Sequence, residues 1–333
     1  MRRRTPGWWY HRSGLMAVLL TPASWLWMLV TRLRWLLARP YRSNVPVICI
    51  GNLTAGGAGK TPVALSVARL LQQMNRSPVF LSRGYGGNRT GPHRVDREDD
   101  TAKDVGDEPL LLARVAQTVV AANRSKGARL AETMNAGAIV MDDGFQNPSL
   151  EKDYSILVVD TSLGIGNGHV IPAGPLRAPL PEQLARAHAV VALGRDDAAA
   201  PVLDRAREAG LTVFEAEIVP RSSPSWLKQK PLIAYTGIGN PEKFFRTLES
   251  ECGELAGKYP FPDHHVFTRD DANALLRAAK DANAQLVTTE KDHVRLAGQP
   301  ELERLRSATR TLPVRMQYRD RAKFKRALAR LFG

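Results

Sequence analysis

The chain has 333 residues, of which 44% are hydrophobic, and it carries a formal net charge of +14. This length and composition allow a substantial core and suggest two domains. Two cysteines, Cys49 and Cys252, exclude a disulfide framework and fit a reducing compartment.

The positive charge is concentrated at the N-terminus. Residues 1–44 contain no acidic residue and eight arginines: Arg2, Arg3, Arg4, Arg12, Arg32, Arg34, Arg39 and Arg42. Five of the six tryptophans lie in the same segment: Trp8, Trp9, Trp25, Trp27 and Trp35. Arginine and tryptophan around an apolar run are typical of a bilayer interface, whereas nucleic-acid binders usually spread arginines over a groove. We therefore expect a membrane surface as the anionic partner, and no nucleic acid.

The apolar run itself extends from Leu15 to Val30. Its 16 residues fall short of the ~20 needed to cross hydrocarbon, and Pro22 interrupts it. A helix lying in or dipping into the membrane is favoured over a spanning helix. A cleaved signal peptide is the least favoured interpretation, because it would export the phosphate-binding loop that follows in the sequence and is described next. Residues 1–40 are predicted to be a basic, Trp-rich membrane-associated helix.

A phosphate-binding loop follows the apolar strand predicted at Val45–Ile50. The loop comprises Thr54, Ala55, Gly56, Gly57, Ala58, Gly59, Lys60 and Thr61. Glycines let backbone N–H groups approach phosphate, the lysine reaches the β- and γ-phosphates of ATP, and the threonine hydroxyl ligates Mg²⁺. Thr54 replaces the usual first glycine. A helix predicted from Pro62 to Met74 completes the strand–loop–helix context.

The rest of this region alternates short apolar runs with segments long enough for helices. Such alternation predicts βαβ units and a mostly parallel sheet. The runs are Val79–Leu81, Ala138–Met141, Ile156–Val159 and Ala189–Leu193.

Acidic and basic residues at loops between these runs are the candidates for chemistry. Asp142 and Asp143 end an apolar run, where a phosphate-loop protein keeps its Mg²⁺-organising carboxylate. Being adjacent, they can both face a metal only past the strand end. Arg83 and Arg177, in loops rich in glycine or proline, have the planar fork that suits phosphate. Asp107 is a candidate proton acceptor.

A second block begins near Pro231. Strands are predicted at Leu232–Tyr235, Leu286–Thr289 and Val314–Tyr318, and a basic amphipathic helix at 321–332. The boundaries expected are 41–224 for the domain that contains the phosphate-binding loop and 225–333 for a smaller α/β domain. His264 and His265 lie in this block as further base candidates, and residues 237–240 and 289–292 as candidates for an adenine pocket.

Eight motifs in order make the chain resemble the tetraacyldisaccharide 4′-kinase family, the lipid A 4′-kinases of Gram-negative bacteria. They are Gly51–Pro62, Ser82–Gly86, Val105–Pro109, Asp142–Gln146, Pro172–Arg177, Gly237–Pro241, Phe261–His265 and Thr289–Asp292. Thr54 at the first glycine position is also like the family.

The resemblance implies transfer of the γ-phosphate of ATP, with Mg²⁺, to the 4′-hydroxyl of a tetraacylated disaccharide 1-phosphate, forming lipid IVA. It implies an α/β fold: a P-loop domain, a smaller α/β domain and an N-terminal helix at the cytoplasmic face of the inner membrane. The family's aspartate–histidine base falls on Asp107 and His264, with His265 left open. Lys60 and Thr61 would hold phosphate and metal, and Asp142 and Asp143 would complete the metal shell. No obligate protein partner is expected.

Two other classes compete with a kinase. A membrane-associated partitioning or switch ATPase shares the Gly-Gly-x-Gly-Lys-Thr sequence, but it carries a lysine just before the paired glycines, where this chain has Ala55. A nucleic-acid-dependent NTPase would fit the pI of about 10.1, but the clustering of arginine with tryptophan argues against it.

Overall fold

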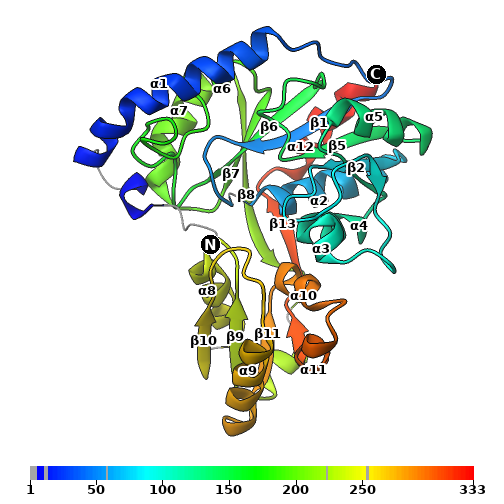
Figure 1. Cartoon of the computed structure of the whole chain (residues 1–333), viewed down its shortest axis with the longest axis vertical. Helices are drawn as coiled ribbons and strands as arrows, with labels where there is room; N and C mark the ends of the chain where they lie inside the picture. Colours follow the sequence, from blue (N-terminus) through cyan, green and yellow to red (C-terminus); the bar gives the residue numbers. More distant parts are fainter. Residues whose placement is uncertain (1–5, 11–13, 58, 223, 253–254) are drawn as a thin grey trace.

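The computed structural model of the chain describes residues 6–10, 14–57, 59–222, 224–252 and 255–333, and it contains two sheets (Figure 1). The larger sheet has nine strands in the order β13-β8-β7-β6-β1-β5-β2-β4-β3. Its seven inner strands are parallel, and β3 and β13 run antiparallel at the two edges. The strands are β1 (Val47–Asn52), β2 (Pro78–Ser82), β3 (His93–Arg94), β4 (Thr118–Val120), β5 (Ala138–Asp142), β6 (Tyr154–Asp160), β7 (Ala189–Leu193), β8 (Thr212–Pro220) and β13 (Val314–Tyr318).

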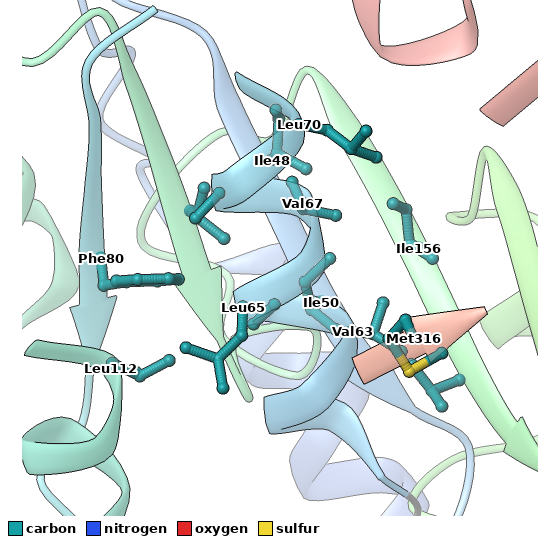
Figure 2. Packing of buried hydrophobic residues seen from close by; sticks show 14 of the residues in the cluster. Ile48, Ile50, Val63, Leu65, Val67, Leu70, Phe80, Leu112, Ile156 and Met316 are labelled. Atoms are coloured by element: carbon teal, nitrogen blue, oxygen red, sulfur yellow. The ribbon is translucent and has the colours of Figure 1, made fainter. Parts of the chain in front are cut away.

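Strand β1 lies at the centre of this sheet and is buried on both faces. Ile48 and Ile50 belong to one apolar cluster, whereas Val47 and Cys49 belong to the cluster on the other face. A parallel strand covered on both sides reads as a continuous apolar run, which is why the sequence signal was strong. Figure 2 shows side chains of helix α2 packing against Ile48 and Ile50.

Helices cover both faces of the large sheet. The first face carries α2 (Lys60–Gln72), α4 (Asp107–Ala113) and α12 (Arg321–Ala329), and the second carries α5 (Arg124–Thr133), α6 (Leu180–Leu184) and α7 (Ala200–Glu208). Shorter segments are α3 (Ala102–Val105), η1 (Gly7–Tyr10), η2 (Asp197–Ala199) and η5 (Arg330–Phe332). The predicted mostly parallel α/β fold is confirmed, and all carboxyl ends of the inner strands meet at one edge.

The smaller sheet has four parallel strands in the order β10-β9-β11-β12. These are β9 (Leu232–Thr236), β10 (Gly257–Pro260), β11 (Gln285–Thr288) and β12 (Thr309–Thr311). Helix α8 covers one face, and α9 and α11 cover the other. The helical segments here are α8 (Pro241–Cys252), α9 (Arg269–Asp281), α10 (Glu290–Leu296), α11 (Glu303–Ala308), η3 (Ser225–Lys228) and η4 (Pro300–Leu302).

The end of the chain corrects one expected boundary. Residues 225–333 do not all belong to the small sheet, because β13 pairs antiparallel with β8 and so completes the large one. Met316 and Tyr318 alternate with exposed neighbours and pack into the large core, as do Phe324 and Leu328 of α12. The helix predicted at 321–332 therefore packs on the first sheet, not on its own block.

Helix α1 (Leu15–Leu36) lies beside α6 on the outside of the large sheet (Figure 1). By length and composition it could cross a membrane. Its polar and small residues face the body, since Ala17 and Ser24 are buried, and Arg32 forms an ion pair with Glu182. The opposite face is apolar and exposed: Leu15, Leu19, Leu26, Leu29 and Leu36. Of the segment predicted as membrane-associated, residues 1–5 and 11–13 lie outside the described residues.

Candidate active site

The phosphate loop connects β1 to α2 at the carboxyl edge of the large sheet. Gly56 and Gly59 have φ angles of 111° and 77°, which side-chain-bearing residues rarely adopt. The Asn52 amide nitrogen donates to the carbonyl oxygens of Thr54 (2.7 Å) and Gly56 (3.1 Å), so the loop is held in a closed curve. Ala58 lies outside the described residues.

Lys60 and Thr61 begin helix α2 two residues earlier than predicted. The Lys60 ammonium donates to Asn52 Oδ1 (3.3 Å) and lies 3.7 Å from Asp143 Oδ1. The Thr61 hydroxyl donates to Asp142 Oδ2 (3.3 Å). The structure thus brings the predicted phosphate lysine and metal-ligating threonine against the two predicted carboxylates.

Asp142 and Asp143 both contact residues at the end of the phosphate loop, Asp142 through Thr61 and Asp143 through Lys60. Asp142 is the last residue of β5, and Asp143 turns the chain with a φ of 52°. Burial, and then the charge of Glu108, raises the pKa of Asp142 to about 7. Burial also acts on Asp143, but Lys60 and Arg177 outweigh it and lower the pKa of that carboxyl.

Arg177 joins this cluster from the loop that precedes α6. Its guanidinium donates to Asp143 Oδ1 (2.9 Å) and to the carbonyl of Thr54 (3.0 Å).

Arg83 follows β2 at the same sheet edge with an exposed side chain, and no hydrogen bond or ion pair joins it to the rest of the described chain. Arg124 opens α5 nearby and is buried; burial lowers the pKa of its guanidinium to about 10. The sequence did not predict that Arg124 lies at this site, because no motif distinguishes it from the other arginines of the chain.

Asp107, at the start of α4, lies against the second block. The Oδ2 atom of its buried carboxylate is 3.1 Å from His264 Nδ1. His265 instead contacts Asp271 (2.9 Å) and stacks on Phe261, so the geometry favours His264 as the partner of Asp107. Asp104, an acidic residue three positions earlier, accepts from the N–H and the hydroxyl of Thr101 at the start of α3.

Two cations from α10 complete the surroundings of Asp107. Arg295 Nε donates to Asp107 Oδ2 (2.6 Å), and Lys291 donates to Glu108 Oε1 (2.9 Å) and lies 3.4 Å from His264 Nε2. Burial would raise the pKa of Asp107, but the His264 hydrogen bond and the charges of Lys291 and Arg295 hold it well below its usual range. Burial lowers the pKa of Lys291, but Glu108 and Asp107 raise it overall.

These cations were not predicted as part of the base site. The motif at 289–292 was considered only for an adenine pocket. Asp292 of that motif is fully buried and bonded to Thr236, Thr289 and Arg295, so its side chain is occupied. Within the motif, Lys291 is the residue that reaches Asp107 and its neighbours.

The loop after β9 approaches the phosphate loop from the other side. A β-carbon on Gly239 would stand only 3.8 Å from the Gly57 amide nitrogen. The carbonyl of Gly237 accepts from Arg295 Nη1 (2.8 Å), so the same arginine links this loop to Asp107. The residues of the small sheet thus reach both the phosphate loop and the candidate base.

The arrangement fits a phosphate chain and a divalent cation. Gly57 has open space where a side chain would stand. Asp142 Oδ1 is buried without a hydrogen-bond partner among the described residues, which leaves an oxygen for a cation ligand. No group of three or more His, Cys, Asp or Glu side chains in the described part of the chain could hold a metal. Magnesium sites typically use one or two carboxylates together with substrate phosphates, which is the set available here.

Comparison with known proteins assigns the chain to a family. A family model described as tetraacyldisaccharide-1-P 4′-kinase (LpxK) matches residues 16–333. The chain is 50% identical to the tetraacyldisaccharide 4′-kinase of Parvibaculum lavamentivorans over 319 residues, covering 94% of this chain and 93% of the relative. It is 45% identical to the enzyme of that name from Rhodopseudomonas palustris over 332 residues, covering 99% and 96%.

A solved structure is similar over the same extent. The crystal structure of LpxK from Aquifex aeolicus in complex with ATP matches with a TM-score of 0.74 at 26% identity. The match covers 96% of this chain and 100% of that one.

Proposed function

Because the chain belongs to the tetraacyldisaccharide-1-phosphate 4′-kinase family, we propose that the residues around its phosphate loop carry that family's reaction. The chain is an ATP-binding kinase of lipid A biosynthesis: the γ-phosphate passes to the 4′-hydroxyl of tetraacyldisaccharide 1-phosphate, giving lipid IVA. The relatives of the same name support this over nearly the whole chain. A partitioning-type ATPase is not favoured.

The phosphate loop and Lys60 are proposed to hold the β- and γ-phosphates. Backbone N–H groups of a glycine-rich loop at a helix N-terminus favour anions, and the ammonium adds a positive charge that moves little during the reaction. Arg177 is proposed to hold the phosphate loop and the Asp143 carboxylate in fixed positions relative to each other. Such positioning and charge stabilisation supply most of the catalysis in phosphoryl transfer.

Thr61, Asp142 and Asp143 are proposed as the residues that hold Mg²⁺. The cation would neutralise charge on the phosphates when bound. Thr61 and Asp142 already touch, and the unpartnered Oδ1 of Asp142 supports this assignment. Binding of a cation requires the ionised form of Asp142, whose raised pKa makes binding release a proton near neutral pH.

Asp107 is proposed to accept a hydrogen bond from the acceptor hydroxyl. It takes the hydroxyl proton as the oxygen bonds to the γ-phosphorus and the bond from that phosphorus to the β–γ bridging oxygen breaks, releasing ADP. The lowered pKa of Asp107 keeps the carboxylate ionised, so that it can accept this hydrogen bond, and also makes it a weaker base than an ordinary aspartate. His264 and Arg295 both contact Oδ2 of this carboxylate, and the Glu108 N–H donates to its Oδ1 (2.9 Å), so the carboxylate is held at both oxygens. The observation that carries the proposal is the position of the Asp107 carboxylate at the carboxyl edge of the large sheet, where Lys60, Asp142 and Asp143 also lie.

Helix α1 is proposed to lie in the plane of the inner membrane at its cytoplasmic face. Contacts with the body run from its first turns to its last, at Ala17, Ser24 and Arg32. A helix held along its length against a folded body favours an in-plane position over a span. Its outer face is apolar, and basic residues follow it, as suits an anionic membrane surface and glycolipid.

Removal of the cation tests these roles. We expect lipid phosphorylation by the full chain in detergent to stop on addition of EDTA and to recover with Mg²⁺. Asp142→Asn and Asp143→Asn should raise the Mg²⁺ concentration needed for half-maximal rate by about tenfold or more. An unchanged Mg²⁺ requirement in both variants would reject the metal assignment.

A further inference from the structure

The loop 170–177 is held by helix α1 on its outer side. The Ser24 hydroxyl, which is buried, donates to the carbonyl of Val170 (2.8 Å) and accepts from the N–H of Ala173 (3.1 Å). The Trp27 indole N–H donates to the carbonyl of Arg177 (3.0 Å). A single turn of helix α1, from Ser24 to Trp27, therefore contacts both ends of this loop.

The inner side of the same loop is bonded to the phosphate loop. The N–H of Arg177 donates to the carbonyl of Leu53 (2.9 Å), and the N–H of Ala55 donates to the carbonyl of Pro175 (2.7 Å). The Arg177 guanidinium adds the bonds to Thr54 and Asp143 described above. The loop is thus a short bridge between α1 and the nucleotide site.

We propose that Trp27 is a positioning residue, which through the backbone of Arg177 sets the place of the Arg177 guanidinium against Thr54 and Asp143. The carbonyl that Trp27 holds and the guanidinium that binds the site belong to one residue, so a shift of the first moves the second. At a membrane surface, water competes less for the indole N–H, which strengthens the bond. The inference rests on the proposed roles of the phosphate loop and Asp143.

Trp25 provides a matched control on the same helix. Trp25 is more exposed than Trp27, at 64% against 46%, and no hydrogen bond joins its indole to any other described residue. Trp27→Phe and Trp25→Phe each replace one interfacial indole by a phenyl ring. Only the first removes a bond to the loop.

Hydrogen exchange of the nucleotide-free full chain in detergent micelles reports the loop directly. We expect backbone amides in residues 53–57 to exchange about tenfold faster in Trp27→Phe than in wild type, since one lost hydrogen bond is worth about that factor. Trp25→Phe should exchange as wild type does. Equal protection in wild type and Trp27→Phe would overturn the proposal.

A double-mutant cycle gives the kinetic test. We expect Trp27→Phe to lower kcat about tenfold, while its effect on KM for the lipid matches that of Trp25→Phe. In an Arg177→Ala background, Trp27→Phe should lower kcat less than about twofold further, because the two residues act in one chain. If the fold-losses of kcat caused by the two single substitutions multiplied in the double variant, the proposal would be overturned. A wild-type chain without lipid phosphorylation would reject the proposed function instead, and the exchange experiment would still decide the role of Trp27.

Discussion

His264 Nδ1 lies 3.1 Å from Asp107 Oδ2, although 157 residues separate the two in sequence. The contact joins the start of α4, on the large sheet, to the loop after β10, on the small one. Arg295 Nε reaches the same carboxylate oxygen at 2.6 Å. The candidate base is therefore assembled only when the two sheets are in place together.

Asp107→Asn should lower kcat for lipid phosphorylation by about 10²- to 10⁴-fold, the usual contribution of a proton acceptor, and leave ATP affinity nearly unchanged. His264→Ala should lower kcat less, since the carboxylate remains. His265→Ala is the matched control, because His265 contacts Asp271 instead. Single-turnover rates and ATP binding measured on the three variants check this. Near-normal turnover by Asp107→Asn would contradict the assignment.

Arg295→Met should destabilise the protein by about 3–5 kcal/mol, because it removes the guanidinium that the buried carboxylates of Asp107 and Asp292 both contact. Urea unfolding of the variant measures this change. Arg295→Lys keeps the positive charge but lacks the planar guanidinium. It should therefore lose less unfolding free energy than Arg295→Met. Equal unfolding free energies for wild type and Arg295→Met would show that the pair does not stabilise the fold.

The titration of Asp142 should appear in the pH dependence of stability. Its pKa of about 7 in the folded protein exceeds the ordinary 3.8. The folded state therefore holds the proton more tightly, and this contribution to stability, full below about pH 4, is lost as pH rises through 7. Asp142→Asn lacks it, so the variant should gain roughly 2–3 kcal/mol relative to wild type between pH 5 and 8. Urea unfolding without Mg²⁺ or nucleotide measures the difference; a pH-independent difference would contradict the prediction.

Two glycines of the phosphate loop should respond differently to alanine. A β-carbon on Gly59 would lie 2.3 Å from Leu193 Cδ2, at a φ of 77°, so Gly59→Ala should cost about 1–3 kcal/mol of stability. Gly57 has open space there, so Gly57→Ala should fold normally and weaken ATP binding. Unfolding curves and ATP titrations of both variants separate the two effects. Equal stability losses would contradict this distinction.

Leu26→Glu should weaken binding of the chain to anionic lipid vesicles by about tenfold or more, because the exposed Leu26 side chain would no longer enter the membrane. Vesicle flotation measures binding, and ATP affinity in detergent should stay unchanged. Undiminished flotation would show that this face of α1 does not contact lipid.

Sequence patterns predicted five of the seven inner strands, β1, β2, β5, β6 and β7, and missed β4 and β8. β1, β5 and β7 are buried on both faces and therefore appear as continuous apolar runs. Asp142 and Asp143 were expected to face the metal only beyond a strand end, and the positive φ of Asp143 provides that turn. Thr61 and Lys60 follow from the loop motif itself.

The parts that sequence could not predict depend on long-range pairing. Arg295 is 188 residues from Asp107 and lies in no motif that marks a base. Val314–Tyr318 was recognised as a strand, but nothing local indicates that its partner is β8 instead of β12. The choice between His264 and His265 also required the fold, because adjacent residues have identical local signals.

Transfer of phosphate to lipid tests the central claim most directly. The full chain is incubated with γ-labelled ATP, Mg²⁺ and tetraacyldisaccharide 1-phosphate in detergent, with Lys60→Ala as the control. We predict a labelled lipid whose mass exceeds that of the acceptor by one phosphate, with the label on the 4′-oxygen, and none from Lys60→Ala. Release of labelled inorganic phosphate without any labelled lipid would contradict the account.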